Sequence, residues 1–355
     1  MARHRIHYPP PSLRCPHCGG QAQGLFYHST YRTRDGPRRL WQCGGCGRRL
    51  SERRGTAFFN LKTPEAEVCC SLDAMLRGDI QTSTAHTRRH RRDTLRRWRR
   101  RAVPRARAVD EEFVTDLSVT DLELDEQWSF AGCKKAAFAE SAERGEAWWH
   151  KSMARESRLL VEQFVSPRTT GAAEMLVNRS FDRLAAGCLP RVSSDGYDAY
   201  TRPVREQVRA LTVYPLWWAL VKKGKPGRPP RPKVIPDPAL LYGQVVKERE
   251  GRRVVKVEKR LVLGAPSTDL SFVSTSLLER QKGTARSRNR YLVRKTYGFA
   301  KRVEYMDDQC EVDKTFYNFC RKHRGLQGER PAMRQGLTDH VWSVAEVLGY
   351  RSAAP

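Results

Sequence analysis

The sequence LELDEQWSF at residues 122–130 predicts a β-strand that carries carboxylates. Leu122 and Leu124 alternate with acids, and this period of two is typical of a strand with one buried face. Asp125 on such a strand has two explanations. It can bond nearby backbone amides at a strand end, or it can bind a metal ion, because Mg²⁺ prefers hard carboxylate oxygens on a rigid element.

Two later segments favour the metal explanation. The sequence SSDGYDAY at residues 193–200 places Asp195 after a short run at 189–192 that predicts a second strand, although Asp-Gly is also an ordinary turn signal. The sequence TSLLERQ at residues 275–281 opens a basic segment. Taken alone, Glu279 in this segment is typical of a surface helix acid that pairs with an arginine.

Together these three segments resemble the catalytic domain of DDE transposases of the insertion-sequence-one-like kind. In that family an Asp-Glu-x-Trp strand, a Ser/Thr-Asp-Gly-Tyr segment and a Glu-Arg-Gln helix follow one another in this order. The sequences YNFCRKH, PAM and GLTDHVWS at residues 317–323, 331–333 and 336–343 resemble the family's closing segments. The resemblance implies a catalytic centre with two Mg²⁺ or Mn²⁺ ions. Carried over position by position, its catalytic and metal-binding acids are Asp125, Asp195 and Glu279.

The charge of the chain predicts its class of partner. The chain has 355 residues, enough for two or three domains, and a formal net charge of +27, which favours nucleic acid as the partner. A membrane is the weaker alternative, because the longest apolar run, at 211–221, is too short to span a bilayer and contains Pro215. Residues 1–7 have no apolar signal region, which predicts a cytoplasmic, reducing compartment. The ten cysteines are then expected to be thiols or metal ligands.

Two Cys-x-x-Cys pairs give the strongest local signal in the chain. Four thiolates at this spacing can surround one Zn²⁺ tetrahedrally, with short strands expected at 26–27 and 40–41 between them, as in a zinc ribbon. The alternatives are a disulfide pair or a chance arrangement. A module of this size does not fold without its metal, so residues 1–60 predict a ribbon with one structural zinc. The expected ligands are Cys15, Cys18, Cys43 and Cys46.

Residues 61–108 predict a helix-turn-helix DNA-binding domain. A first helix is expected over 65–77, a short second one from residue 82, and a third from Arg92 through Trp98. Residues 103–108 are expected to connect this domain to the next.

Eleven arginines lie between Arg88 and Arg107, against a single acid. A solvated basic linker is the alternative to a DNA-binding helix, but Leu95 and Trp98 give the segment an apolar side that a linker does not need. The sequence does not sort base contacts from phosphate contacts. The expected DNA-binding residues here are Arg88, Arg89, Arg91, Arg92, Arg96 and Arg97.

Residues 109–350 predict the catalytic domain of an α/β, multidomain chain. The expected strands lie at 122–130, 148–153, 157–165 and 189–195. Thr170 is expected to cap a helix that runs through Leu184. This is the ribonuclease-H-like order, a mixed sheet flanked by helices, in which the first and fourth strands meet at the sheet centre. Asp125 and Asp195 then share a metal although they are far apart in the chain.

An insertion is expected at about 222–264. Its first part, 222–237, is rich in proline, glycine and basic residues and predicts a linker or an extended basic arm. Its Gly-Arg-Pro core resembles minor-groove hooks, with Arg228 as the inserted side chain. Its second part alternates around Glu250 and Gly251 and predicts a β-hairpin with a basic surface near DNA.

The resemblance implies a DNA transposase that binds the ends of its insertion sequence, hydrolyses them to free 3′ hydroxyls and joins these to target DNA. Two positions depart from the family, with Lys282 in place of asparagine and Met306 in place of histidine. Both departures bear on activity more than on fold. Lys282 is expected either to pair with Glu279 or, like Arg286, to contact DNA.

Other functions fit the sequence less well. One alternative is a repressor derived from a decayed transposase, which keeps the zinc ribbon and basic helices without cleavage. A tyrosine recombinase is a weaker alternative, because it leaves the three acidic segments without a role. Glu126 and Asp198 are expected to be structural acids. The resemblance also implies a prokaryotic, nucleoid-associated protein in the cytoplasm, with transposon ends and target DNA as partners and a dimer or larger assembly on paired ends.

Overall fold

The computed structural model describes residues 9–134, 143–207, 239–251 and 253–351. The chain forms two compact units. Unit 1 comprises Met1–Val114, Ser287–Gly298 and Glu304–Pro355, and unit 2 comprises Thr115–Arg286 and Phe299–Val303. The C-terminal segments therefore belong to the same unit as the N-terminal ones. The expected domain boundaries at residues 60 and 108 stay a prediction, because compactness alone does not identify a zinc ribbon or a helix-turn-helix.

Unit 1 begins with a small antiparallel sheet. Its strands are β1 (Leu25–Thr33), β2 (Gly36–Cys43) and β3 (Arg49–Ser51), in the order β1-β2-β3. Trp41 is fully buried and packs with Leu13 and Leu50 in a core of its own. The short strands expected at 26–27 and 40–41 are present and longer than expected, because β1 and β2 pair directly across a two-residue turn at Arg34 and Asp35.

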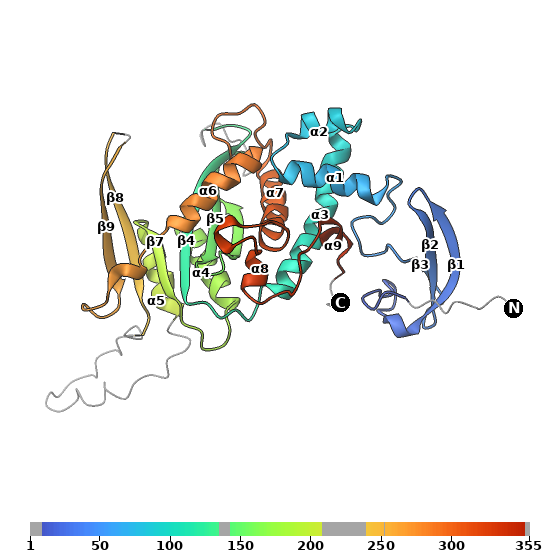
Figure 1. The fold of residues 1–355 in the computed structure, drawn as a ribbon, viewed down its shortest axis with the longest axis horizontal. Coiled ribbons are helices and arrows are strands. Elements are labelled where there is room, and N and C mark those ends of the chain that lie inside the picture. The colour runs from blue at the N-terminus through green and yellow to red at the C-terminus, as the bar shows by residue number, and fades with distance from the viewer. Residues whose placement is uncertain (1–8, 135–142, 208–238, 252, 352–355) are drawn as a thin grey trace, which may run out of the picture. The chain divides into compact units, whose positions relative to one another are not determined.

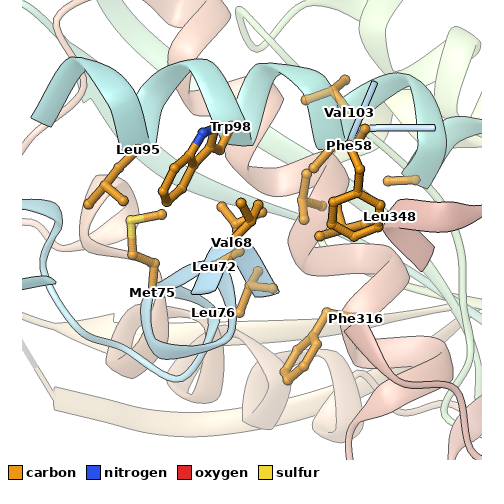
Figure 2. Packing of buried hydrophobic residues seen from close by; sticks show 14 of the residues in the cluster. Phe58, Val68, Leu72, Met75, Leu76, Leu95, Trp98, Val103, Phe316 and Leu348 are labelled. Atoms are coloured by element: carbon orange, nitrogen blue, oxygen red, sulfur yellow. The ribbon is translucent and has the colours of Figure 1, made fainter. Parts of the chain in front are cut away.

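Three helices follow the sheet (Figure 1): α1 (Glu65–Leu76), α2 (Gln81–Thr87) and α3 (Arg92–Phe113). The turn after α1 requires a glycine, because Gly78 has φ +118° and a Cβ there would lie 2.9 Å from the backbone oxygen of Ser287. Figure 2 shows how α1 and α3 share one core, in which Leu72 and Met75 face Leu95 and Trp98. Phe58, Phe316 and Leu348 complete this core from distant parts of the chain.

The expectation of a connection at 103–108 is wrong, because α3 continues through these residues. Ala102, Val103, Ala106 and Val109 are buried along one side of the helix and extend its apolar stripe. Pro104 lies inside the helix, where it removes a hydrogen bond at a cost of about 3 kcal/mol. Burial of the apolar stripe outweighs that cost.

The remaining elements of unit 1 come from the C-terminal part of the chain. They are η7 (Arg290–Leu292), α7 (Val303–Thr315), the π-helix η8 (Phe316–Cys320), η9 (Arg324–Leu326), α8 (Pro331–Arg334) and α9 (Val344–Gly349). Phe113 at the end of α3 makes edge-on ring contacts with Phe319, Trp342 and Tyr350. These contacts explain why the last residues of the chain pack with the first unit. Met306, at the position where the family has histidine, is fully buried in α7.

Unit 2 is built on a six-stranded sheet in the order β6-β5-β4-β7-β8-β9 (Figure 1). The strands are β4 (Asp121–Ala131), β5 (Gly145–Ala154), β6 (Leu160–Ser166), β7 (Arg191–Asp195), β8 (Tyr242–Glu250) and β9 (Arg253–Leu263). β7 pairs in parallel with β4 and with β8, and the other neighbours are antiparallel. The predicted adjacency of the first and fourth strands is confirmed by the pairing of Leu124 with Ser194. This mixed sheet is compatible with a ribonuclease-H-like domain.

Helices cover both faces of the sheet. They are α4 (Thr170–Asp182), α5 (Thr201–Gln207) and α6 (Ser276–Arg288), with short 3₁₀ turns η3 (Asp198–Tyr200) and η6 (Leu270–Phe272). Ser180 of α4 donates to Ser152 of β5 at 2.7 Å, whereas α6 contacts Glu123 and Asp125 of β4. Ser152 pairs with Leu124, whose side chain points away from those of Glu123 and Asp125, so α4 and α6 lie on opposite faces. The expected cap residue was wrong by one position, because Thr169 rather than Thr170 accepts from Ala172.

The predicted hairpin is present around Gly251 as β8 and β9. It is more than an insertion, because β8 pairs with β7 along Tyr242–Val245 and is a strand of the main sheet. The basic arm expected at 222–237, with Arg228, lies outside the described residues. Within the described ranges, no helix combines the length and the apolar character needed to cross a membrane.

Candidate metal centres and nucleic-acid interface

The four predicted zinc ligands lie together in unit 1. The sulfur atoms of Cys15, Cys18, Cys43 and Cys46 all lie within 4.8 Å of one another. The two pairs sit on equivalent turns, since Cys15 donates its N–H to Gly20 and Cys43 donates its N–H to Arg48. The Sγ–Sγ distances of 3.4 and 3.5 Å exceed a disulfide bond of about 2.05 Å, so the disulfide alternative is not formed.

This donor set fits zinc. Four cysteine sulfurs around one point are one of the usual ligand sets of a structural Zn²⁺. Burial acts to raise the pKa of the Cys15 thiol, but backbone hydrogen bonds from His17 and Cys18 and contacts with neighbouring sulfurs outweigh it and lower that pKa to about 7. The pKa values of the Cys18 and Cys46 thiols are raised instead: backbone hydrogen bonds from Gly20 and Arg48 act to lower them, but contacts with neighbouring sulfurs and burial outweigh these bonds. Cys15 therefore ionises readily without metal, whereas Cys18 and Cys46 would need the charge of a bound Zn²⁺ to lose their protons.

A second cluster lies in unit 2, at the end of β7. Asp125, Glu126 and Asp195 each place one carboxylate oxygen within 4.8 Å of the others. The parallel pairing of β4 and β7 stops at Leu124 and Ser194, so the next residues of both strands meet just beyond the paired segment. Asp195 is held by the backbone N–H of Tyr197 at 3.1 Å. The sheet topology therefore brings together Asp125 and Asp195, as the sequence predicts.

The electrostatics of this carboxylate cluster favour a bound cation. Asp125 is almost fully buried, and its pKa is raised by that burial against the opposing effect of Lys282. The pKa of Asp195 is also raised, first by burial and then by the charge of Glu126. Both carboxylates thus ionise less readily than in water, and a divalent cation would reverse the penalty. Hard oxygen donors of this kind fit Mg²⁺ or Mn²⁺.

Glu126 is the acid in the cluster that sequence reasoning did not select. It pairs with Arg168 at 2.5 Å and accepts from the Tyr200 hydroxyl at 2.9 Å, and one of its carboxylate oxygens also lies with those of Asp125 and Asp195, so its expected structural role stays a prediction. Arg168 in turn stacks over the ring of Tyr197, 3.9 Å from its centroid. Neighbouring residues of a strand point to opposite faces, so alternation along β4 does not predict that Glu126 and Asp125 both approach Asp195, although their carboxylate oxygens do. The adjacency of two acids on one strand was the available signal.

Glu279, the third expected catalytic acid, lies on α6 and outside the 4.8 Å cluster. Its side chain is 44% exposed and pairs with Lys247 at 3.1 Å. Lys282 joins it to the cluster, with its Nζ 2.5 Å from Oδ2 of Asp125 and 3.8 Å from Oε2 of Glu279. Burial acts to raise the pKa of Glu279, but Lys282 and Lys247 outweigh it and lower that pKa.

The start of α6 is fixed to the sheet by a buried acid. Glu123 is fully buried and accepts the backbone N–H of Leu278 at 3.0 Å. Arg155 donates to the other oxygen of Glu123 at 3.1 Å and to the backbone oxygen of Ser274 at 3.0 Å. The residue next to Leu278 is Glu279, so these bonds set the distance between Glu279 and β4.

The expected DNA-binding arginines cluster around one turn of unit 1. Arg88, Arg89 and Arg91 lie in the turn between α2 and α3, and Arg92, Arg96 and Arg97 lie at the start of α3. All are exposed except Arg96, which is half-buried, pairs with Asp93 and stacks on Tyr305. Arg286 is half-buried on α6 in unit 2, and Lys282 is nearly buried. Arg228 lies outside the described residues.

Comparisons with known proteins place few limits on these sites. No family model matches the chain, and no curated protein matches it. Among solved structures, 42% of the chain matches 56% of a chain in "Crystal structure of the Mos1 Strand Transfer Complex", at 12% sequence identity and a TM-score of 0.18. This chain is thus similar to little more than half of that one, and so low a TM-score carries no argument. Function has to be inferred from the residues of the two clusters and the basic turn.

Proposed function

We propose that the chain is a metal-dependent DNA transposase, which binds the ends of a mobile element, cuts them and joins the resulting 3′ hydroxyls to target DNA. One observation carries the proposal. Asp125 and Asp195, picked out by motifs far apart in the sequence, have carboxylates within 4.8 Å of each other at the centre of the sheet. Two ionised carboxylates this close repel each other, and a cation bound between them would offset that repulsion.

The cation would be held by Asp125, Glu126 and Asp195, with Glu279 at the edge of the site. When bound, a divalent ion activates water and stabilises the charge on the oxygens of the phosphodiester. Around it, Arg168 holds the Glu126 carboxylate and Tyr200 donates to its second oxygen. These two contacts fix the orientation of the buried Glu126 carboxylate.

DNA binding is assigned to the turn between α2 and α3. Arg88, Arg89, Arg91, Arg92 and Arg97 are exposed there beside a buried apolar core, which is the arrangement of a helix presented to a phosphate backbone. The four-cysteine cluster is assigned one structural zinc. Binding of paired ends by a dimer or larger assembly also belongs to this proposal.

The proposal is tested by cleavage of labelled element ends in Mg²⁺ or Mn²⁺. Asp195→Asn keeps the side-chain shape and removes one charged ligand, so cleavage is expected to fall more than about 100-fold while end binding stays intact. Asp198→Asn is the matched control, because Asp198 is exposed three residues away and lies outside the cluster. Equal cleavage by wild type and Asp195→Asn would place the chemistry elsewhere. Specific end binding without any cleavage by wild type would support a DNA-binding repressor instead.

A further inference from the structure

We propose that the ammonium group of Lys282 takes the place of a second metal ion, so that the site holds one divalent cation rather than two. This inference rests on the proposed function, because it concerns the same carboxylates. It assigns the position between Asp125 and Glu279 to a cation that belongs to the protein.

The contacts of Lys282 are those of a cation in a ligand site. Its Nζ lies 2.5 Å from Oδ2 of Asp125, and Oε2 of Glu279 lies on its other side at 3.8 Å. The Lys282 side chain is 11% exposed and that of Asp125 is 1% exposed. Ammonium and carboxylate therefore meet where water does little to screen them, which strengthens their attraction.

The position of this ammonium is set by the fold. Glu279 and Lys282 are three residues apart on α6, so both lie on the same face of the helix. The helix is fixed to β4 by the bond from Leu278 to Glu123, and to β5 by a 2.6 Å bond from Lys151 to Gln281. Lys282 lies directly after Gln281. A lysine held from both sides in this way differs from a surface lysine that moves freely.

The charges divide the site into two parts. Glu126 has Arg168, Glu279 has Lys247, and Asp125 has Lys282 as an ion-pair partner. Among the residues that the structure describes, Asp195 forms no ion pair with lysine or arginine. The charges of Lys282 and Arg168 act on Asp195 from beyond ion-pair distance, where they oppose the rise in its pKa that burial and Glu126 cause. Among the described residues, the part of the site beside Asp195 thus has no lysine or arginine in direct contact, whereas the part between Asp125 and Glu279 already contains the Lys282 ammonium. A second divalent ion in that part would be repelled by the ammonium at close range.

The test counts Mn²⁺ ions bound to the full-length, zinc-loaded chain without DNA, by electron paramagnetic resonance titration. Wild type is expected to bind about one Mn²⁺ per chain, and Lys282→Asn about two. Two ions about 3.5–4 Å apart also give a spin-coupled spectrum, which is expected from Lys282→Asn alone. Lys282→Arg keeps the positive charge and is expected to stay at about one ion.

Lys247→Asn is the matched control. It removes a lysine that contacts Glu279 but not Asp125, so its count is expected to remain that of wild type. Two ions in wild type, two in Lys282→Arg or an unchanged count in folded Lys282→Asn would each overturn the inference. If Lys282→Asn does not fold, the wild-type and Lys282→Arg counts still decide it.

Failure of the proposed function has a different signature. In that case wild type and Asp195→Asn bind the same number of Mn²⁺ ions, and wild type does not cut labelled element ends. An enzyme that cuts with two ions in wild type would keep the function and reject only the role of Lys282.

Discussion

The four thiols of unit 1 and the three carboxylates of unit 2 are both groups that repel one another once ionised, but their surroundings differ. The thiols lie on two tight turns beside a three-stranded sheet whose core contains little more than Trp41, Leu13 and Leu50. The carboxylates lie on paired central strands of a six-stranded sheet, which has helices on both faces. Zinc should therefore hold the three-stranded sheet and its turns together, whereas a cation at the carboxylates should relieve their mutual repulsion in a scaffold that is expected to fold without it.

The largest effect is expected from removing the thiols. Cys43→Ser/Cys46→Ser should lose the zinc and unfold the three-stranded sheet, because structural zinc supplies on the order of 10 kcal/mol to modules of this size. Metal analysis and limited proteolysis within residues 9–60 would measure both losses. Cys69→Ser/Cys70→Ser, outside the cluster, is the control and should keep its zinc. Unchanged zinc content in Cys43→Ser/Cys46→Ser would mean that these cysteines do not hold the zinc.

Glu123 provides a comparison with the carboxylate cluster inside unit 2, because both oxygens of this buried acid accept hydrogen bonds. Glu123→Ala should lower the free energy of unfolding by about 3 kcal/mol, since it strands Arg155 and frees the N–H of Leu278. Denaturant unfolding gives this value. Glu156→Ala, an exposed acid on the turn after β5, should change it by less than about 0.5 kcal/mol. Equal effects from the two variants would mean that α6 is not held by Glu123.

A smaller effect is expected at the turn between α2 and α3, to which DNA binding is assigned in the proposal. Arg97→Ala should weaken end binding about tenfold, or about 1.4 kcal/mol, and lower the slope of log affinity against log salt by about 0.9 for one lost phosphate contact. The full-length chain is needed, because Phe316 and Leu348 complete the core under α3. Arg334→Ala removes an exposed arginine that pairs with Glu329, and should leave the slope unchanged. A slope that falls equally in both variants would argue against phosphate contacts by the turn between α2 and α3.

The smallest effect is a pH dependence of the metal-free protein. The pKa of Asp195 is raised in the folded state, so the folded chain keeps a proton that the unfolded chain has already lost above the ordinary pKa near 3.8. Stability should then fall as pH rises through the interval between the two pKa values. Thermal unfolding of Asp195→Asn should show a shallower fall, whereas Asp198→Asn should follow wild type. An identical slope in all three proteins would mean that Asp195 ionises normally.

The sequence predicted the parts of the molecule that depend on local spacing. The cysteine cluster follows from two short motifs, and α1 from an apolar face. The proximity of Asp125 and Asp195 was predicted from the expected strand order, in which the first and fourth strands are neighbours. Sequence motifs at both positions made that order recognisable. The continuation of α3 through Pro104 was missed, because the residues that bury it come from the other end of the chain. Lys282 was weighed only against Glu279 and DNA, since its contact with Asp125 depends on how α6 crosses the sheet.

The most direct test of the carboxylate centre is the thermal stability of wild type and Asp195→Asn, with and without Mn²⁺. Without metal, Asp195→Asn should be at least as stable as wild type, because it removes a repelling charge. At a Mn²⁺ concentration ten times its dissociation constant, wild type should gain about 1.4 kcal/mol, and Asp195→Asn should gain almost nothing. A wild type that Mn²⁺ does not stabilise, or an Asp195→Asn variant stabilised equally, would contradict a cation site at these carboxylates.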